Sequence, residues 1–160
     1  MGSSGNRGHS PINGVEISLC EVTRDNWVDC IRLSLHPEQA SFVASNVDTI
    51  AESRFEPHYR LRAICAAGRP VGFLAFCPEN DPEDPETYWL FRFMIDREHQ
   101  GKRYGTVALK LAIAEMRALG AKVILTMHKP ENQAAARLYA QSGFKESGML
   151  DDGDILLRLT

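Results

Sequence analysis

The chain has 160 residues, a formal net charge of −3 and a hydrophobic fraction of 44%. This length predicts a single domain, and the hydrophobic content is sufficient for a core of its own. An acidic chain has little attraction for a phosphate backbone, so we expect no nucleic-acid partner. Because no run of apolar residues is long enough to span a bilayer, we also expect no membrane partner and a cytoplasmic location.

The four cysteines, Cys20, Cys30, Cys65 and Cys77, contain no Cys-x-x-Cys pair. Neither they nor the histidines have the spacing of metal ligands, so we expect no metal and no redox motif. Free thiols, mostly buried, in a reducing compartment are the simplest interpretation.

The first part of the chain predicts a strand followed by two helices. Residues 1–13 begin with the polar stretch "MGSSGNRGHS" and are expected to be a disordered leader or the remnant of an expression tag. The domain is therefore expected to span residues 14–160. A strand is predicted over 15–22, a helix over 24–35 and a second, short helix over 46–55.

The middle of the chain predicts β-structure. Residues 59–77 alternate between polar and apolar on both sides of a "GRP" turn, which favours a hairpin. The segment 78–86, "PENDPEDPE", combines three prolines with five acids and is predicted to be a loop. The strand predicted over 87–96, "TYWLFRFMID", is apolar on both faces, so we expect it at the centre of the sheet.

The last third alternates between helix and strand. A helix is predicted up to about Leu119, then a buried strand over 122–127 and a helix over 131–142 that ends at Gly143. A hairpin with its turn at "DDGD" closes the chain. A strand–helix–strand unit of this kind predicts an α/β fold with a mixed sheet and parallel pairing in the middle.

The junction "QGKRYG", residues 100–105, joins a buried strand to a helix. The first backbone N–H groups of a helix have no intrahelical partner and carry the positive end of the helix dipole. Gly101 and Gly105 would let an anion approach the backbone, and Lys102 and Arg103 add positive charge. A pyrophosphate suits this arrangement, and the alternative is a plain tight turn with glycines at positive φ.

Two motifs in order carry a family resemblance. "QGKRYG" resembles motif A of the GNAT N-acetyltransferase superfamily, Gln/Arg-x-x-Gly-x-Gly/Ala, and "NQAAARLYAQSGF" resembles the next signature, Asn-x-x-Ala followed by Leu-Tyr and Gly-Phe. The order of elements fits over residues 15–160. Arg103 stands where the motif has its middle glycine; because a helical φ remains open to arginine, we expect the change to be tolerated.

The resemblance implies a single-domain GNAT fold, with a mixed sheet of about six to seven strands and about four helices. It also implies a V-shaped splay between the fourth strand (about 88–96) and the fifth (122–127). Acetyl-CoA would bind there as cosubstrate, with no metal. Its pantetheine would pair with Met94 and Ile95 and contact Asn132. Its pyrophosphate would lie on the backbone amides of Gln100, Gly101, Lys102, Arg103, Tyr104, Gly105 and Thr106.

Tyr139 matches the family tyrosine that is placed to protonate the leaving CoA thiolate. Some members keep a glutamate midway along the fourth strand as the general base, but "YWLFRFM" has no carboxylate. The base is left open between Glu38, Asp96, His99, His128, a water relay and an amine that arrives neutral.

Strings such as "EQASFVASN", "IAESRFEP" and "FRFMIDREHQGKRYG" resemble the bacterial spermine/spermidine (diamine) acetyltransferase branch. This resemblance implies a polyamine acceptor and a homodimer. Carboxylates would then be needed near the acceptor, and we predict Glu38, Glu52, Glu56 and Trp89 as substrate-binding residues. The alternatives are transfer to an amino acid, peptide or drug amine, and a CoA-binding module without turnover.

Overall fold

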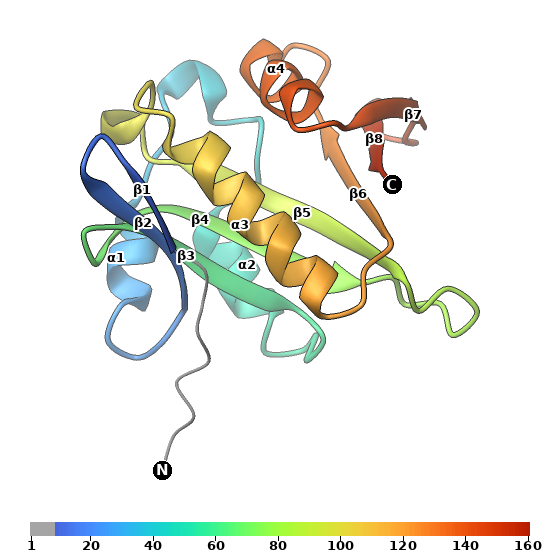
Figure 1. Ribbon diagram of the computed structural model, residues 1–160, viewed down its shortest axis with the longest axis horizontal. Coiled ribbons are helices and arrows are strands. Elements are labelled where there is room, and N and C mark those ends of the chain that lie inside the picture. Colours follow the sequence, from blue (N-terminus) through green and yellow to red (C-terminus); the bar gives the residue numbers. More distant parts are fainter. Residues whose placement is uncertain (1–8) are drawn as a thin grey trace.

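Residues 9–160, the part of the chain that the computed structural model describes, form one mixed sheet with helices on both faces (Figure 1). The strand order is β1-β2-β3-β4-β5-β6-β8-β7, and only the β5/β6 pair is parallel. The α/β fold with parallel pairing in the middle is thereby confirmed. The strands are β1 (His9–Ile12), β2 (Val15–Glu21), β3 (Arg60–Ala66), β4 (Arg69–Pro78), β5 (Thr87–Ile95), β6 (Val123–His128), β7 (Lys145–Met149) and β8 (Ile155–Leu159). The helices are α1 (Trp27–Arg32), α2 (Asn46–Glu52), α3 (Tyr104–Ala118) and α4 (Gln133–Gln141), with short 3-10 turns η1 (Pro37–Gln39) and η2 (Arg97–His99).

The sheet has eight strands, whereas six to seven were expected, and the additional strand lies in the predicted leader. β1 pairs with β2 from His9↔Ser18 to Ile12↔Val15 through a turn at Asn13 and Gly14, whose φ angles are 49° and 78°. Asn-Gly is a strong local signal for a two-residue hairpin turn, so the domain begins before residue 14. The expectation for residues 1–8 lies outside the described residues.

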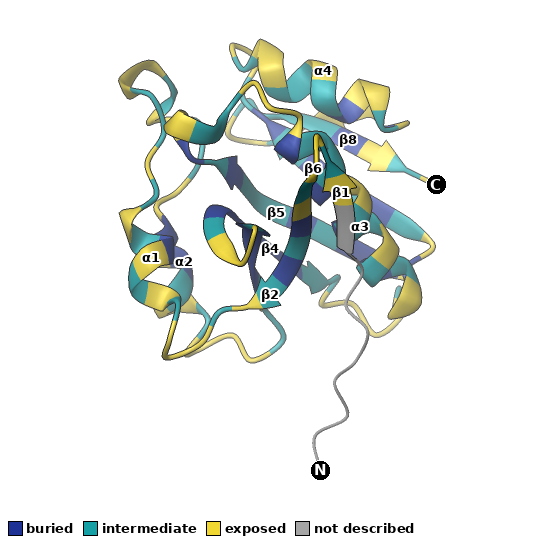
Figure 2. Cartoon of the chain, turned by 60° about the vertical axis from the view of Figure 1, so that its left-hand side comes forward, coloured by how far each residue is buried: buried dark blue, intermediate teal, exposed yellow. Residues whose placement is uncertain are grey.

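The core is divided between the two faces of the sheet. α3 lies on one face, and α1 and α2 lie on the other (Figures 1 and 2). The larger apolar cluster joins α3 and α4 to the sheet and includes Leu109 and Tyr139. The smaller one joins α1 to the opposite face through Cys30 and Phe73. The alternation of side chains along the central strands supplies both clusters, as expected for a sheet that is covered on both sides.

A bulge in β5 opens the sheet at its centre. Ala75 pairs with Arg92 but the next residue, Phe76, pairs with Leu90, so Phe91 is the extra residue. The parallel ladder between β5 and β6 also ends at Leu90, opposite Thr126. Bulges bend a strand and increase its twist. Beyond Leu90 the two strands therefore separate, which gives the predicted splay.

None of the helices in the described part of the chain is long and apolar enough to cross a membrane. The four cysteines are free thiols. Burial raises the pKa of the Cys30 thiol to about 11 and that of Cys65 to about 12. Both are therefore protonated and poorly nucleophilic at neutral pH.

Candidate active site

Two adjoining cavities lie at the end of β5 where the strands separate. We call the first, of about 360 Å³, the turn cavity because it lies over the turn between β5 and α3. We call the second, of about 400 Å³, the strand cavity because residues of β5 and β6 line it. The two cavities share part of their lining. The shared wall residues are Phe42, Val43, Phe93, Asn132 and Ala135.

The turn cavity is bounded by the start of α3. Gly101 has φ +78° and Arg103 has φ +66°, and the helix begins at Tyr104. The N–H groups of its first turn, including that of Gly105, have no intrahelical partner, and within residues 9–160 no side chain caps them. The junction therefore combines free amides, the positive end of a helix and two nearby cations. This is a suitable environment for an anion.

Arg103 differs from the expectation. Its φ of +66° and ψ of 13° are left-handed, not the right-handed helical conformation that an arginine adopts without cost. The left-handed conformation costs a residue with a Cβ roughly 1–2 kcal/mol. Glycine at the middle position of the motif avoids this cost, which explains the consensus at this position.

We expect Arg103→Gly to raise the free energy of unfolding by about 0.5–1 kcal/mol, because the strain it relieves exceeds the added chain entropy of glycine. Urea denaturation followed by circular dichroism measures the change. Lys102→Gly is the matched control, because Lys102 is a neighbour whose φ is not positive. That variant should be destabilised slightly. Equal effects of the two substitutions would mean that Arg103 is not strained.

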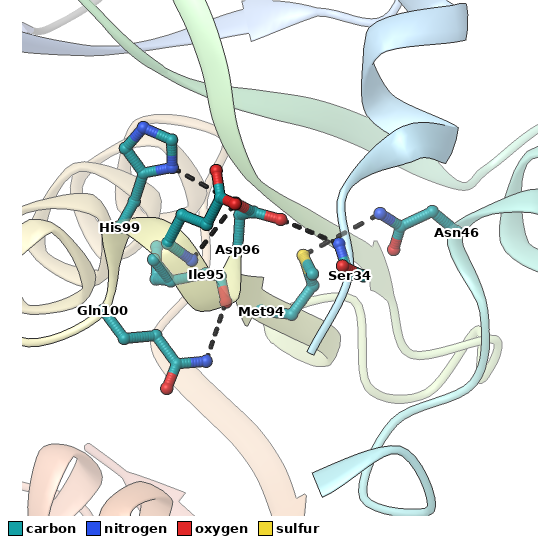
Figure 3. A network of polar contacts seen from close by, with 8 residues as sticks. Ser34, Asn46, Met94, Ile95, Asp96, His99 and Gln100 are labelled. Carbon is teal, nitrogen blue, oxygen red and sulfur yellow. Dashed lines mark hydrogen bonds and ion pairs between the residues drawn. The ribbon is translucent and has the colours of Figure 1, made fainter. Parts of the chain in front are cut away.

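Asp96 fixes the entrance to the turn (Figure 3). Its Oδ1 accepts a hydrogen bond from the N–H of Ser34 at 2.8 Å, and its Oδ2 accepts one from the N–H of Glu98 at 3.3 Å. His99 Nδ1 lies 3.2 Å from the same Oδ2. Asp96 is only 8% exposed and lines neither of the two cavities. Its carboxylate therefore acts in the structure as an anchor between α1 and the turn.

The Gln100 side chain holds the other side of the turn. Its Nε2 donates to the carbonyl oxygen of Ile95 at 3.0 Å and to Gln39 Oε1 at 3.0 Å (Figure 3 shows the first of these). Gln39 Nε2 returns a hydrogen bond to Gln100 Oε1 at 3.3 Å. This reciprocal pair ties the η1 turn to the β5–α3 junction, so the wall formed by the segment after η1 has a fixed position.

Tyr139 projects from α4 into the wall of the strand cavity. It is 5% exposed, and its ring packs edge-on against Phe93 and Phe144 at centroid distances of 6.5 and 5.4 Å. Burial raises the pKa of Tyr139 to about 12, and the neighbouring Thr126 side chain partly opposes this shift. Thr126 Oγ1 in turn donates to the carbonyl oxygen of Leu90 at 2.8 Å, at the point where the strands separate. The phenol is therefore neutral at physiological pH and remains a hydrogen-bond donor.

Asn132 lies where both cavities meet. Its Oδ1 accepts a hydrogen bond from the N–H of Ala135 at 3.1 Å, which makes Asn132 the N-cap of α4. Within residues 9–160 its Nδ2 has no hydrogen-bond partner. The capping role therefore leaves the donor half of the amide available to a ligand.

The predicted acceptor residues do not come together at the cavities. Glu38, Glu52, Glu56 and Trp89 are absent from the described residues that line the turn and strand cavities. Glu52 comes closest, since its Oε2 lies 4.0 Å from Arg92 Nη2, and Arg92 lines the strand cavity. Trp89 donates instead to a glutamate in the loop before β5, at the opposite end of that strand from the site.

Several cavity residues were missed by the sequence analysis. Phe42 and Val43 follow η1 and line both cavities. Two adjacent apolar residues in the otherwise polar stretch "EQASFVASN" were the available signal. Asp152 and Asp154, in the turn between β7 and β8, line the strand cavity, and Lys129 Nζ lies 2.8 Å from Asp154 Oδ1. No local pattern marks these aspartates, because only the sheet order brings their turn beside β6.

The two histidines considered as bases are separated by the fold. His99 lines the turn cavity and approaches Asp96, whereas His128 lines the strand cavity at the end of β6. Glu38 is exposed on η1. Of the candidates named from the sequence, His128 is therefore the one that shares the strand cavity with Tyr139.

Comparisons with known proteins agree with this arrangement. The model of the Acetyltransferase (GNAT) family matches residues 22–144. A "Probable spermine N(1)-acetyltransferase" of Bacillus subtilis subsp. natto is 30% identical over 141 residues, which cover 86% of this chain and 93% of that protein. A mycothiol acetyltransferase of Propionibacterium freudenreichii subsp. shermanii is 30% identical over 112 residues, 68% of this chain but 35% of that protein.

Solved structures share the fold at low sequence identity. An aminoglycoside acetyltransferase in complex with coenzyme A superposes with a TM-score of 0.74 at 16% identity, covering 90% of this chain and 94% of the other. An N-acetyltransferase from Staphylococcus aureus gives 0.69 at 17% identity, covering 89% and 97%. The chain therefore belongs to the GNAT family of acetyltransferases, and it is an N-acetyltransferase that uses acetyl-CoA.

Proposed function

We propose that this enzyme acetylates a primary amine of a small polycation, most simply a polyamine such as spermine or spermidine. The observation that carries the proposal is the pair of cavities that meet at the opened strands, one suited to the coenzyme and the other to an amine. The name of the Bacillus relative, which refers to spermine, supports the choice of acceptor.

In this proposal the turn cavity holds acetyl-CoA. The pyrophosphate lies against the uncapped start of α3, where free N–H groups and the cations Lys102 and Arg103 neutralise its charge. The pantetheine runs along the end of β5 past Met94 and Ile95. The backbone groups of these two residues on the side toward β6 are not paired with that strand, because the β5/β6 ladder ends at Leu90. An extended ligand can pair with such a free strand edge. Asn132 Nδ2 offers a further donor.

The strand cavity receives the amine. Its walls carry Arg92 and Lys129 as cations and Asp152 and Asp154 as anions. Lys129 is paired with Asp154 at 2.8 Å, and Arg92 Nη2 lies 4.0 Å from Glu52. Because both cations already have acidic partners, the carboxylate of Asp152 can attract a second ammonium group of the acceptor.

The reaction is direct attack of the amine nitrogen on the thioester carbonyl carbon. A negative charge develops on the departing sulfur, and a neutral Tyr139 hydroxyl lowers its energy by donating a hydrogen bond. The mostly apolar walls around Phe93 exclude water and strengthen that interaction.

A thiol-release assay with acetyl-CoA tests the acceptor. Spermine, spermidine and putrescine are compared with several amino acids and an aminoglycoside. We expect saturable CoA release with the polyamines and a kcat/KM at least tenfold below theirs for the amino acids. An acceptor that carries a carboxylate is the second candidate, because Arg92 and Lys129 lie on the cavity wall. Preference for the amino acids would replace the polyamine proposal with that one.

A further inference from the structure

We propose that His128 is the general base, and that its Nε2 takes the proton from the attacking amine. The inference rests on the proposed function, since it concerns the same transfer. It answers a question that β5 raises, because Thr87–Ile95 contains no carboxylate that could accept this proton.

The contacts of His128 determine which nitrogen carries a proton. His128 is the last residue of β6, is 8% exposed and lines the strand cavity. Its Nδ1 lies 2.7 Å from the carbonyl oxygen of Lys129. A carbonyl oxygen can only accept, so Nδ1 is the donor, and in the neutral ring Nε2 carries the lone pair.

The Nε2 atom is available to a substrate. Within residues 9–160 it has no hydrogen-bond partner. Among the described side chains, the polar atoms that are sealed from solvent and lack a hydrogen bond do not include Nε2, so Nε2 is not sealed. A mostly buried ring in the cavity wall, with one basic nitrogen that is neither hydrogen-bonded nor sealed, has the form of a proton acceptor.

The strand places this base on the same face as Thr126, the residue that Tyr139 approaches. Thr126 and His128 are two residues apart on β6, so their side chains point to the same face. Tyr139 interacts with Thr126, and two strand residues span about 7 Å. Acid and base can thus flank the thioester carbonyl carbon, His128 on the nitrogen side and Tyr139 on the sulfur side.

The lone pair of the amine nitrogen forms the N–C bond, the C–S bond breaks and its electron pair goes to sulfur. The proton on the nitrogen passes to His128 Nε2, giving an imidazolium that keeps its Nδ1 hydrogen bond. The thiolate accepts a hydrogen bond from Tyr139 and leaves, and the imidazolium returns its proton to solvent. The products are the N-acetylated amine and CoA.

The other titratable groups of the strand cavity are poorer bases. Asp154 is paired with Lys129, and Asp152 is exposed, with its Oδ1 accepting from the Asp154 N–H at 2.9 Å. Arg92 and Lys129 are cations and have no lone pair to offer. Tyr139 is needed as a donor. His128 is thus the group in this cavity that combines a free lone pair with burial.

The test is His128→Gln, which keeps a polar side chain but cannot take up the proton at neutral pH. With whichever amine the unaltered enzyme acetylates fastest, we expect kcat/KM at pH 7 to fall about a hundredfold, within the usual range for a general base. The Kd for CoA should change less than twofold. His58→Gln, at a histidine that lines neither of the two cavities, is the matched control and should retain full activity.

A purely structural histidine would give a different pH profile. The acid limb of the unaltered enzyme should disappear in His128→Gln, and the only remaining rise with pH should be the one that follows the free fraction of the substrate amine, at higher pH. Added imidazole should partly restore His128→Ala. A profile that keeps its acid limb, or no rescue in a folded His128→Ala, would overturn the proposal.

The outcomes separate this proposal from the polyamine proposal. If the enzyme acetylates another amine and His128→Gln loses that activity, the polyamine proposal is wrong and the general-base proposal stands. If the enzyme acetylates spermine and His128→Gln keeps full activity, the polyamine proposal stands and the general-base proposal is wrong. Absence of acetylation with every amine would overturn both proposals. Independently, ¹⁵N NMR of the imidazoles should find His128 protonated at Nδ1 alone at pH 8. A proton on Nε2 would exclude it as the base.

Discussion

Replacing Gly105 with glutamate is expected to weaken binding of coenzyme A more than a hundredfold. A Cβ at this position would lie 3.6 Å from Ile95 Cγ1 and 3.8 Å from both Leu138 Cδ2 and Phe93 Cε1. The longer glutamate chain would then extend into the turn cavity, and its charge would face the proposed pyrophosphate position at the start of α3. Isothermal titration calorimetry with CoA measures the loss.

Two variants at the same position separate the causes. Those three contacts are ordinary van der Waals distances, so Gly105→Ala should fold normally and lose little affinity. Gly105→Gln has nearly the size of glutamate without the charge, so it isolates the steric part of the effect. CoA binding to Gly105→Glu with unchanged affinity would show that the turn is not a phosphate cradle.

Tyr139→Phe is expected to lower kcat by about 10²–10³-fold, the usual cost of removing one donor from a developing anion. CoA affinity should be almost unchanged, because phenylalanine keeps the ring contacts with Phe93 and Phe144. Since burial raises the pKa of Tyr139 to about 12, the hydroxyl stays protonated throughout the working range. Tyr139 should therefore contribute no alkaline loss of rate below about pH 11.

The matched control is Tyr88→Phe. Tyr88 lies near the other end of β5, away from both cavities, and its hydroxyl donates to the carbonyl oxygen of Leu119 at 3.4 Å. Removing that hydroxyl should leave kcat unchanged at a small cost in stability. If Tyr88→Phe and Tyr139→Phe lost equal activity, the loss would reflect packing, and Tyr139 would be a core residue without a chemical role.

Local signals in the sequence were sufficient for the order of elements and for the glycine turn. The apolar run at 87–96, the amphipathic segment after residue 104 and the glycines after both later helices are all short-range patterns, and they gave the α/β sheet with parallel pairing. The strand at His9–Ile12 was not predicted, because the polar composition of residues 1–13 favoured a disordered leader. The Asn13–Gly14 turn was the local signal for this strand. The roles assigned to Tyr139 and the turn amides stay predictions that the experiments above would test.

The acceptor side of the site required the tertiary structure. Glu52 and Glu56 were predicted because they are acidic and lie in the helical region that usually covers the acceptor in the family. They do not line the strand cavity, whereas Asp152 joins it from the last hairpin. That contact exists because β8, and not β7, pairs with β6, and sheet order is not encoded in local periodicity.

The left-handed backbone conformation of Arg103 and the opening of the sheet likewise became visible only in the tertiary structure. The bulge at Phe91 separates β5 from β6 and so creates the cavities, and its position depends on register against β4. The sequence by itself determined which segments after residue 14 are strands and helices and where the glycine turn lies, because these depend on residues close together in the chain. The fold alone decided which distant side chains face the transferred group, because that depends on how the strands align.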